Sequence, residues 1–253
     1  MTNRDDESRI GRIQHTSVDR RSLLRLGSAG AGLAFLARVP GMGDQALAAP
    51  FAQDAAPGGT LTYARDGDAD SLDPHKTTTT LSWQVQSQLY ETLTAFDADG
   101  NIVPNLAKSW EISDDGLEVT FTLQEGVTFH DGTPFNAEAV KATFDRFIDE
   151  ATGNPSKASI GPLTGTEAVD EMTAKMTFSE PFAPLLSFLT DPFAGIISPA
   201  GVEAAGDDFG NAPVGSGPFK FVEWVKGDHI TLERFDEYKG FHPMYNHEGP
   251  AYL

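Results

Sequence analysis

The clearest pattern in the chain is a two-residue alternation of apolar and polar side chains over residues 117–123. This period predicts a strand with one buried face, and Asp114-Asp115-Gly116 predicts the turn that leads into it. Shorter apolar patterns, bounded by Gly, Pro and Asp, predict further strands. These lie near residues 60–64, 165–169, 174–178, 196–198, 219–225 and 230–234, with the last two joined as a hairpin.

Two stretches carry helical spacing. Apolar residues between Trp83 and Leu93 predict a helix over about 82–93, and Asn136 is typical of an N-cap for a helix that ends near Asp149. A third, short helix is expected from Pro181 to Leu189, since proline is accepted in a first helical turn. Strands and helices alternate irregularly, so we expect an α/β (mixed α+β) fold with a mixed sheet.

The first 48 residues have a different character. The paired arginines Arg20 and Arg21 precede an apolar, small-residue run at 26–37, and Ala46-Leu47-Ala48 resembles a cleavage site. The run spans roughly 12 residues, short of the ~20 that a membrane-spanning helix needs. We therefore expect a twin-arginine-type signal peptide over 1–48, read by the twin-arginine export machinery, followed by a flexible Ala/Pro/Gly-rich tether at 49–59.

The charge balance and the lack of cysteine exclude or disfavour several classes of function. The 253 residues contain 18 Lys and Arg against 37 Asp and Glu, a formal charge of −19, which disfavours nucleic-acid binding. The chain has no cysteine, which excludes disulfides, thiolate metal ligands, a cysteine nucleophile and the acylated cysteine of a lipoprotein. His242 and His247 flank Pro243 without a carboxylate cluster, so no metal site is expected.

Three blocks, in the same order along the chain, resemble the family 5 extracellular solute-binding proteins, which serve peptide, glutathione and nickel ABC importers. The first block is Ser71-Leu72-Asp73-Pro74-His75 with Leu89-Tyr90-Glu91-Thr92-Leu93. The second runs from Leu106-Ala107-Lys108-Ser109-Trp110 to Ala137-Glu138-Ala139-Val140, and includes Phe129-His130-Asp131-Gly132-Thr133-Pro134. The third is Pro213-Val214-Gly215-Ser216-Gly217-Pro218-Phe219 with Tyr238-Lys239-Gly240. Ala139 departs from the acidic residue that the family often has there.

The resemblance implies a two-lobe fold of the periplasmic-binding-protein type II kind that closes over its ligand. Members of the family are about twice as long as this chain. We therefore expect residues 60–253 to hold the N-terminal part of the first lobe, incomplete at the C-terminus, with most of the second lobe missing. The full-length protein is expected to be a monomer outside the cytoplasmic membrane.

The resemblance also implies which segments border the ligand cleft: the loop after the first strand and the Gly-Ser-Gly-Pro turn. Glycines there would let backbone N–H groups approach a ligand closely. The residues expected to contact ligand are Thr77, Thr78, Ser82, Trp83, Phe193, Ala194, Gly215, Ser216 and Gly217. Each has a structural alternative: the turn as a tight connection, Trp83 as core, the threonines as a solvated loop.

No phosphate loop, dinucleotide fingerprint or nucleophile elbow is present, so we expect no enzyme and no cofactor. The expected role is capture of di- or oligopeptides for delivery to ABC permease subunits. Two alternatives stay open: the same role with a nickel chelate, oligosaccharide or opine, and a non-transporting sensory or interaction module. The fold by itself does not name the ligand.

Overall fold

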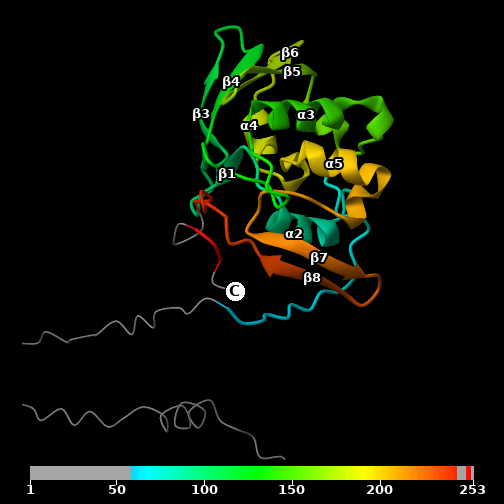
Figure 1. Ribbon diagram of the computed structural model, residues 1–253. Helices are drawn as coiled ribbons and strands as arrows, with labels where there is room; N and C mark the ends of the chain where they lie inside the picture. Colours follow the sequence, from blue (N-terminus) through cyan, green and yellow to red (C-terminus); the bar gives the residue numbers. More distant parts are fainter. Residues whose placement is uncertain (1–57, 244–248, 252–253) are drawn as a thin grey trace, which may run out of the picture. The chain divides into compact units, whose positions relative to one another are not determined.

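The computed structural model describes residues 58–243 and 249–251 (Figure 1). The predicted signal peptide lies outside the described residues, as do His247 and all but the last two residues of the predicted tether. The fold is mixed α/β, as expected. The expected mixed sheet is wrong for the described residues, because every strand pairing there is antiparallel and the strands form three separate sheets. In the order of the chain, the strands and short helices beyond those discussed below are β1 (Thr94–Phe96), β2 (Ile102–Pro104), η1 (Glu150–Thr152), η2 (Lys157–Ile160), α5 (Pro199–Ala205) and η4 (Gly206–Asn211).

A four-stranded antiparallel sheet has the order β3-β4-β6-β5. Its strands are β3 (Ala107–Ile112), β4 (Glu118–Leu123), β6 (Thr173–Phe178) and β5 (Leu163–Asp170). The alternation over 117–123 has the predicted outcome, because Val119, Phe121 and Leu123 on β4 are buried. The turn into β4 is also as predicted, since Gly116 takes a positive φ of 70° there.

Helix α3 (Ala137–Ile148) packs on β5 and β6 (Figure 1). Asn136 caps it as predicted: its side-chain oxygen accepts from the Ala139 N–H at 3.1 Å. Val140, Phe144 and Phe147 are fully buried against the sheet. Burial stabilises each such side chain by about 1.5–3 kcal/mol, so this face holds the helix on the sheet.

A second apolar cluster surrounds α2 (Thr80–Leu89). It combines Leu72, Leu89 and Phe209 with one face of the hairpin β7 (Phe219–Val225) and β8 (His229–Arg234). Figure 1 shows α2 beside this hairpin, and α2 contacts β7. The predicted hairpin is confirmed, and its partly buried apolar side chains pack on the cluster around α2.

Four predicted elements differ from the structure: two predicted strands do not form, and two predicted helices have other ends. Residues 60–64 form no strand: Leu61 and Tyr63 are 70% and 71% exposed, so their alternation has no buried face. Residues 196–198 are buried but form no strand, because the Ile196 N–H donates to Glu91 and the Ser198 N–H to Val214, two different segments.

The other two errors concern helix ends. The helix expected from Pro181 is only α4 (Leu185–Phe188), since Pro184 disfavours a helical conformation at the residue before it and takes the N-cap itself. Helix α2 begins at Thr80 and ends at Leu89, because Tyr90 adopts an extended backbone. Leu93 is buried by the connection that follows the helix, and not by helical periodicity.

Candidate functional site

The polar loop before α2 is organised around one carboxylate. Oδ1 of Asp70 accepts hydrogen bonds from the hydroxyls of Ser82 (2.5 Å), Thr77 (2.6 Å) and Thr79 (2.9 Å). It also accepts from the Ser71 N–H at 2.9 Å. Desolvation works against ionisation of Asp70, but these hydrogen bonds outweigh it and lower its pKa to about 2. The loop is therefore folded around the ionised carboxylate of Asp70, which accepts all of these hydrogen bonds.

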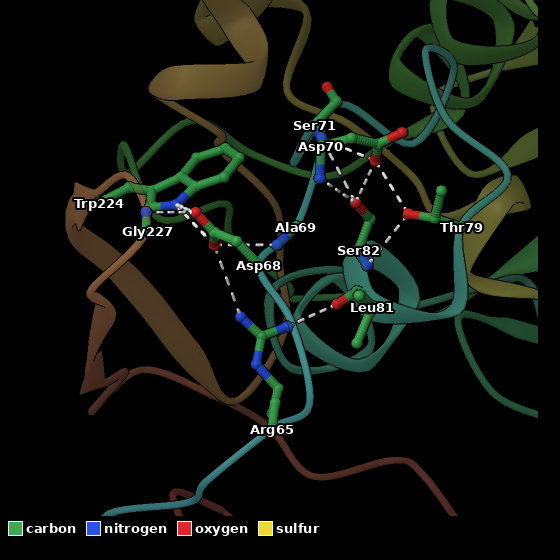
Figure 2. Close-up of polar contacts among 10 residues, drawn as sticks. All are labelled: Arg65, Asp68, Ala69, Asp70, Ser71, Thr79, Leu81, Ser82, Trp224 and Gly227. Atoms are coloured by element: carbon green, nitrogen blue, oxygen red, sulfur yellow. Dashed lines mark hydrogen bonds and ion pairs between the residues drawn. The ribbon is translucent and has the colours of Figure 1, made fainter.

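The first turn of α2 belongs to the same network. Thr79 is the N-cap, and its hydroxyl accepts from the Ser82 N–H at 3.4 Å. The Ser82 hydroxyl in turn accepts from the Asp70 and Ser71 N–H groups, at 3.1 and 3.3 Å. Figure 2 shows these side chains converging at the start of the helix. The position of α2 is thus tied to the loop that precedes it.

A second carboxylate, two residues earlier, holds the β7–β8 hairpin. Asp68 accepts from Trp224 Nε1 at 3.0 Å and from the Gly227 N–H at 2.7 Å (Figure 2). The hydrogen bond from Gly227 is the main reason that the pKa of Asp68 is lowered. Arg65 lies nearby and donates to the Leu81 carbonyl at 2.6 Å. The segment 65–70 therefore braces both the hairpin and the start of α2.

A buried ion pair anchors the same loop to α3. Arg146 donates to both carboxylate oxygens of Asp73, at 3.1 and 2.5 Å, and its Nη1 lies 2.8 Å from Nδ1 of His75. Desolvation, and after it the charge of Arg146, lowers the pKa of His75 to about 3. His75 is therefore neutral and accepts from the guanidinium through Nδ1.

Two aromatic residues from different elements meet beside this loop. Trp83 of α2 stacks on Phe193 of η3 (Pro192–Ala194), with ring centroids 5.9 Å apart and planes 11° apart. Thr78 is exposed at the end of the loop. Ala194, by contrast, is fully buried in the core. Thr78, Trp83 and Phe193 are thus the predicted contact residues whose side chains are not committed to the core or to Asp70.

The Gly-Ser-Gly-Pro turn packs on the other end of α2. A Cβ on Gly215 would lie 2.1 Å from the Leu89 carbonyl oxygen, and one on Gly217 would lie 2.6 Å from the Gln88 carbonyl oxygen. The Gly217 N–H also donates to the Leu89 carbonyl at 2.9 Å. These contacts explain why glycine is required at both positions: a side chain would clash with the backbone at the end of α2. Between them, Ser216 is buried, and its hydroxyl has no hydrogen-bond partner among residues 58–243 and 249–251.

His130, whose His-Asp-Gly context superficially suggests catalysis, supports this turn. Its Nδ1 accepts from the Gly215 N–H at 3.3 Å, and its Nε2 lies 3.0 Å from the Gly217 carbonyl. Those two contacts require a neutral ring that donates through Nε2. Burial lowers the pKa of His130 to about 4, which keeps the ring neutral.

A small cavity of about 60 Å³ opens between the elements that carry these residues. Ser87 of α2, Pro192 of η3 and Pro218 line it. Glu91 is also in its lining and is almost fully buried; it accepts from the Tyr238 hydroxyl at 2.9 Å. Burial raises the pKa of Glu91 to about 8 against the effect of that hydrogen bond, so the carboxyl group is largely protonated at neutral pH.

The structure therefore divides the nine predicted residues into groups. Thr77 and Ser82 meet at Asp70, Trp83 and Phe193 meet each other, and the turn 215–217 packs on the end of the helix that carries Trp83. The sequence analysis did not assign Asp70, Glu91 or Tyr238 to the site, and quoted the last two only within the blocks that resemble the family. The cluster of hydroxyl residues at 77–82 was a signal for Asp70, since such hydroxyls need an acceptor. Tyr238, which donates to Glu91, lies 147 positions away in the sequence, and no local sequence pattern predicts this contact.

Comparison with known proteins settles the family. Residues 101–252 match the family described as bacterial extracellular solute-binding proteins, family 5 Middle. The chain belongs to this family. The glutathione-binding protein GsiB of Pectobacterium atrosepticum is 40% identical over 168 residues, which cover 66% of this chain and 33% of that protein. The chain thus spans about a third of the length of the curated relatives that it matches.

Solved structures agree. The ABC transporter-associated periplasmic binding protein DppA from Helicobacter pylori, in complex with peptide STSA, has a TM-score of 0.68 at 33% identity, covering 75% of this chain and 41% of that one. AgaA from A. tumefaciens R10, in complex with agropinic acid, has a TM-score of 0.64 at 34% identity, with 68% and 35% covered. The fold of the family 5 chain is that of part of these periplasmic binding proteins, and the family is one of transport-associated binding proteins.

The described part of the chain has neither a metal-binding cluster nor a membrane-spanning helix. Among residues 58–243 and 249–251, no group of three or more His, Cys, Asp or Glu side chains is placed to hold a metal ion. Within the same ranges, no helix has the length and apolar character needed to cross a bilayer.

Proposed function

We propose that this chain contributes one side of the solute site of an extracytoplasmic receptor for an ABC importer, and that the solutes are short peptides, glutathione among them. The carrying observation is the Trp83–Phe193 stack at the first turn of α2, the helix that follows the polar loop with exposed Thr78. Ser87 and Pro192, from the same two elements as the stacked rings, line a small cavity. Such a surface suits the mixed apolar and amide character of a peptide. In this proposal the protein delivers its solute to membrane permeases and performs no chemistry.

The peptide class is supported by two relatives, one named for glutathione and one solved with a tetrapeptide. An opine is the second candidate, because AgaA was solved with agropinic acid. Export through the twin-arginine machinery and a monomeric full-length protein are part of the proposal and rest on the sequence: Arg20, Arg21 and the apolar run after them.

Tryptophan fluorescence tests the site directly, since the chain has only three tryptophans. Titration with reduced glutathione and with the peptide Ser-Thr-Ser-Ala is expected to change the emission of Trp83. Trp83→Phe should remove the change, and the matched variant Trp110→Phe should keep it, because Trp110 lies on β3. Agropinic acid serves as a third ligand.

Each outcome has a clear meaning. A saturable change with either peptide that disappears in Trp83→Phe supports the proposal. A response to agropinic acid alone would replace peptides with opines as the solute class. Absence of any response, with no rise in melting temperature at a large excess of each ligand, would refute the proposed solute site.

A further inference from the structure

The predicted contact loop has two kinds of side chain in alternation. Thr77 and Thr79 both direct their hydroxyls to Asp70, while Thr78, between them, is exposed. Thr79 has an extended backbone, in which successive side chains point to opposite sides. Holding the Thr77 and Thr79 hydroxyls on Asp70 therefore directs Thr78 away from that carboxylate, although Thr79 is itself exposed. The same carboxylate therefore keeps the hydroxyls of Thr77 and Thr79 on one side of the loop and leaves Thr78 on the other.

The helix that follows repeats this division. Ser82 is fully buried and donates to Asp70 at 2.5 Å. Trp83, the next residue, lies about 100° further around the helix and stacks on Phe193. Holding Ser82 therefore sets the rotation of the first turn, and with it the direction of the Trp83 ring.

Asp70 has no ion-pair partner within 4.0 Å among the described side chains. Its negative charge is therefore stabilised by hydrogen-bond donors from the loop and the helix. These donors are the three hydroxyls and one N–H group already named. Charge-assisted hydrogen bonds of this kind are shorter and stronger than neutral ones. Without the carboxylate, the hydroxyls of buried Thr77 and Ser82 would lose their shared acceptor.

We propose that Asp70 is the positioning residue of the solute site: its carboxylate orients residues 77–82 so that Thr78 and Trp83 face the solute. The inference rests on the proposed function, because it assigns the solute contacts to those two residues. It also changes the expected roles of Thr77 and Ser82, which hold the loop in place and do not touch the solute.

The test compares Asp70→Ala with Asp68→Ala and Asp70→Asn. Asp68 is the matched control, since it has the same chemistry two residues earlier but holds Trp224 and Gly227, and its link to α2 is indirect, through a 4.0 Å ion pair with Arg65. Asparagine keeps a carbonyl oxygen at position 70 without the charge. Amide hydrogen exchange of residues 77–83 is measured on each variant without ligand, and the affinities for glutathione and Ser-Thr-Ser-Ala are measured by calorimetry.

We expect Asp70→Ala to raise exchange over 77–83 at least tenfold and to weaken binding of the peptide probe about tenfold. Asp68→Ala should raise exchange at residues 224–229 and change affinity less than twofold, and Asp70→Asn should recover most of the affinity. Unchanged exchange over 77–83 in Asp70→Ala would overturn the proposal, and so would faster exchange with wild-type affinity. If the wild-type protein binds neither probe, the proposed function fails and the solute role of Asp70 fails with it. The exchange data would then show separately whether Asp70 braces the loop.

Discussion

Substitution of Gly215 by alanine tests whether the Gly-Ser-Gly-Pro turn is shaped by its contact with α2. The added Cβ would lie 2.1 Å from the Leu89 carbonyl oxygen and 2.6 Å from Cδ1 of Tyr90. Contacts of Cβ below 3.0 Å are essentially never seen in proteins. The carbonyl belongs to the backbone of the last helical turn and cannot rotate away, so the turn or the end of the helix must move by about 1 Å or more.

That movement strains hydrogen bonds that hold the turn. The Gly215 carbonyl accepts from the His130 N–H at 2.8 Å, and the Gly217 N–H donates to the Leu89 carbonyl at 2.9 Å. Each is worth about 1 kcal/mol, and overpacking adds about 1–3 kcal/mol. We therefore expect Gly215→Ala to lower the free energy of unfolding by about 3–5 kcal/mol. For a domain of this size, that corresponds to a fall in melting temperature of about 10 °C.

Urea denaturation followed by circular dichroism measures this loss, and Gly165→Ala is the matched control. Gly165 lies in β5 and lacks a left-handed φ, and a Cβ added to it would meet no heavy atom within 4 Å, so its change should stay within about 1 kcal/mol. If the two variants have the same stability within 1 kcal/mol, the steric account of Gly215 is wrong. The remaining explanation for the glycine would then be close approach of a ligand to the backbone.

Three further predictions concern stability. Burial raises the pKa of Glu91 in the folded state from 4.5 to about 8, so the free energy of unfolding of the wild type should be highest below pH 4.5 and should fall as the pH rises to about 8. Glu91→Gln should abolish this pH dependence. Glutamine needs no proton, and the variant should be more stable than wild type by about 3 kcal/mol at pH 7, measured by urea melts across this range; a parallel pH profile would contradict the reasoning. Arg146→Met should destabilise by about 3 kcal/mol, since it leaves buried Asp73 without its cation; a melting temperature equal to that of wild type would show that the ion pair contributes little. Asn136→Ala should cost about 1 kcal/mol through loss of the α3 cap, and Asn136→Ser should recover most of it in the same thermal melts.

The sequence pattern predicted correctly those strands and helices in which the spacing of apolar residues matches the spacing of buried residues. Strand β4 and helix α3 were predicted because one face of each is continuously apolar and continuously buried. Strand β3 was missed, because Lys108, Ser109 and Glu111 are exposed and only Ala107 is fully buried, which leaves no clear alternation. Residues 60–64 show the reverse error: they have the alternation, but neither Leu61 nor Tyr63 is buried.

The candidate site could be predicted as a set of segments but not as a set of roles. The structure brings Thr77 and Ser82 together at Asp70, with Trp83 next to Ser82 on α2, and their contact with solute stays a prediction. Which of them turns inward depends on Asp70, whose hydrogen bonds cross up to 12 positions. The packing of Gly215 on Leu89 crosses more than a hundred positions. Contacts of that range depend on tertiary packing, for which a local period carries no information.

Helix α2 shows how these long-range contacts bear on function. It has ten residues, and isolated helices of that length are marginal in water, so its orientation must come from its surroundings. Asp70 holds its first turn, and the glycine turn packs against its last. Trp83 projects from the helix between these two attachments, at the point where it meets Phe193. A solute that contacts Trp83 therefore interacts with a side chain whose direction is set at both ends of the helix, and a change at either end should alter solute affinity without removing any atom that touches the solute.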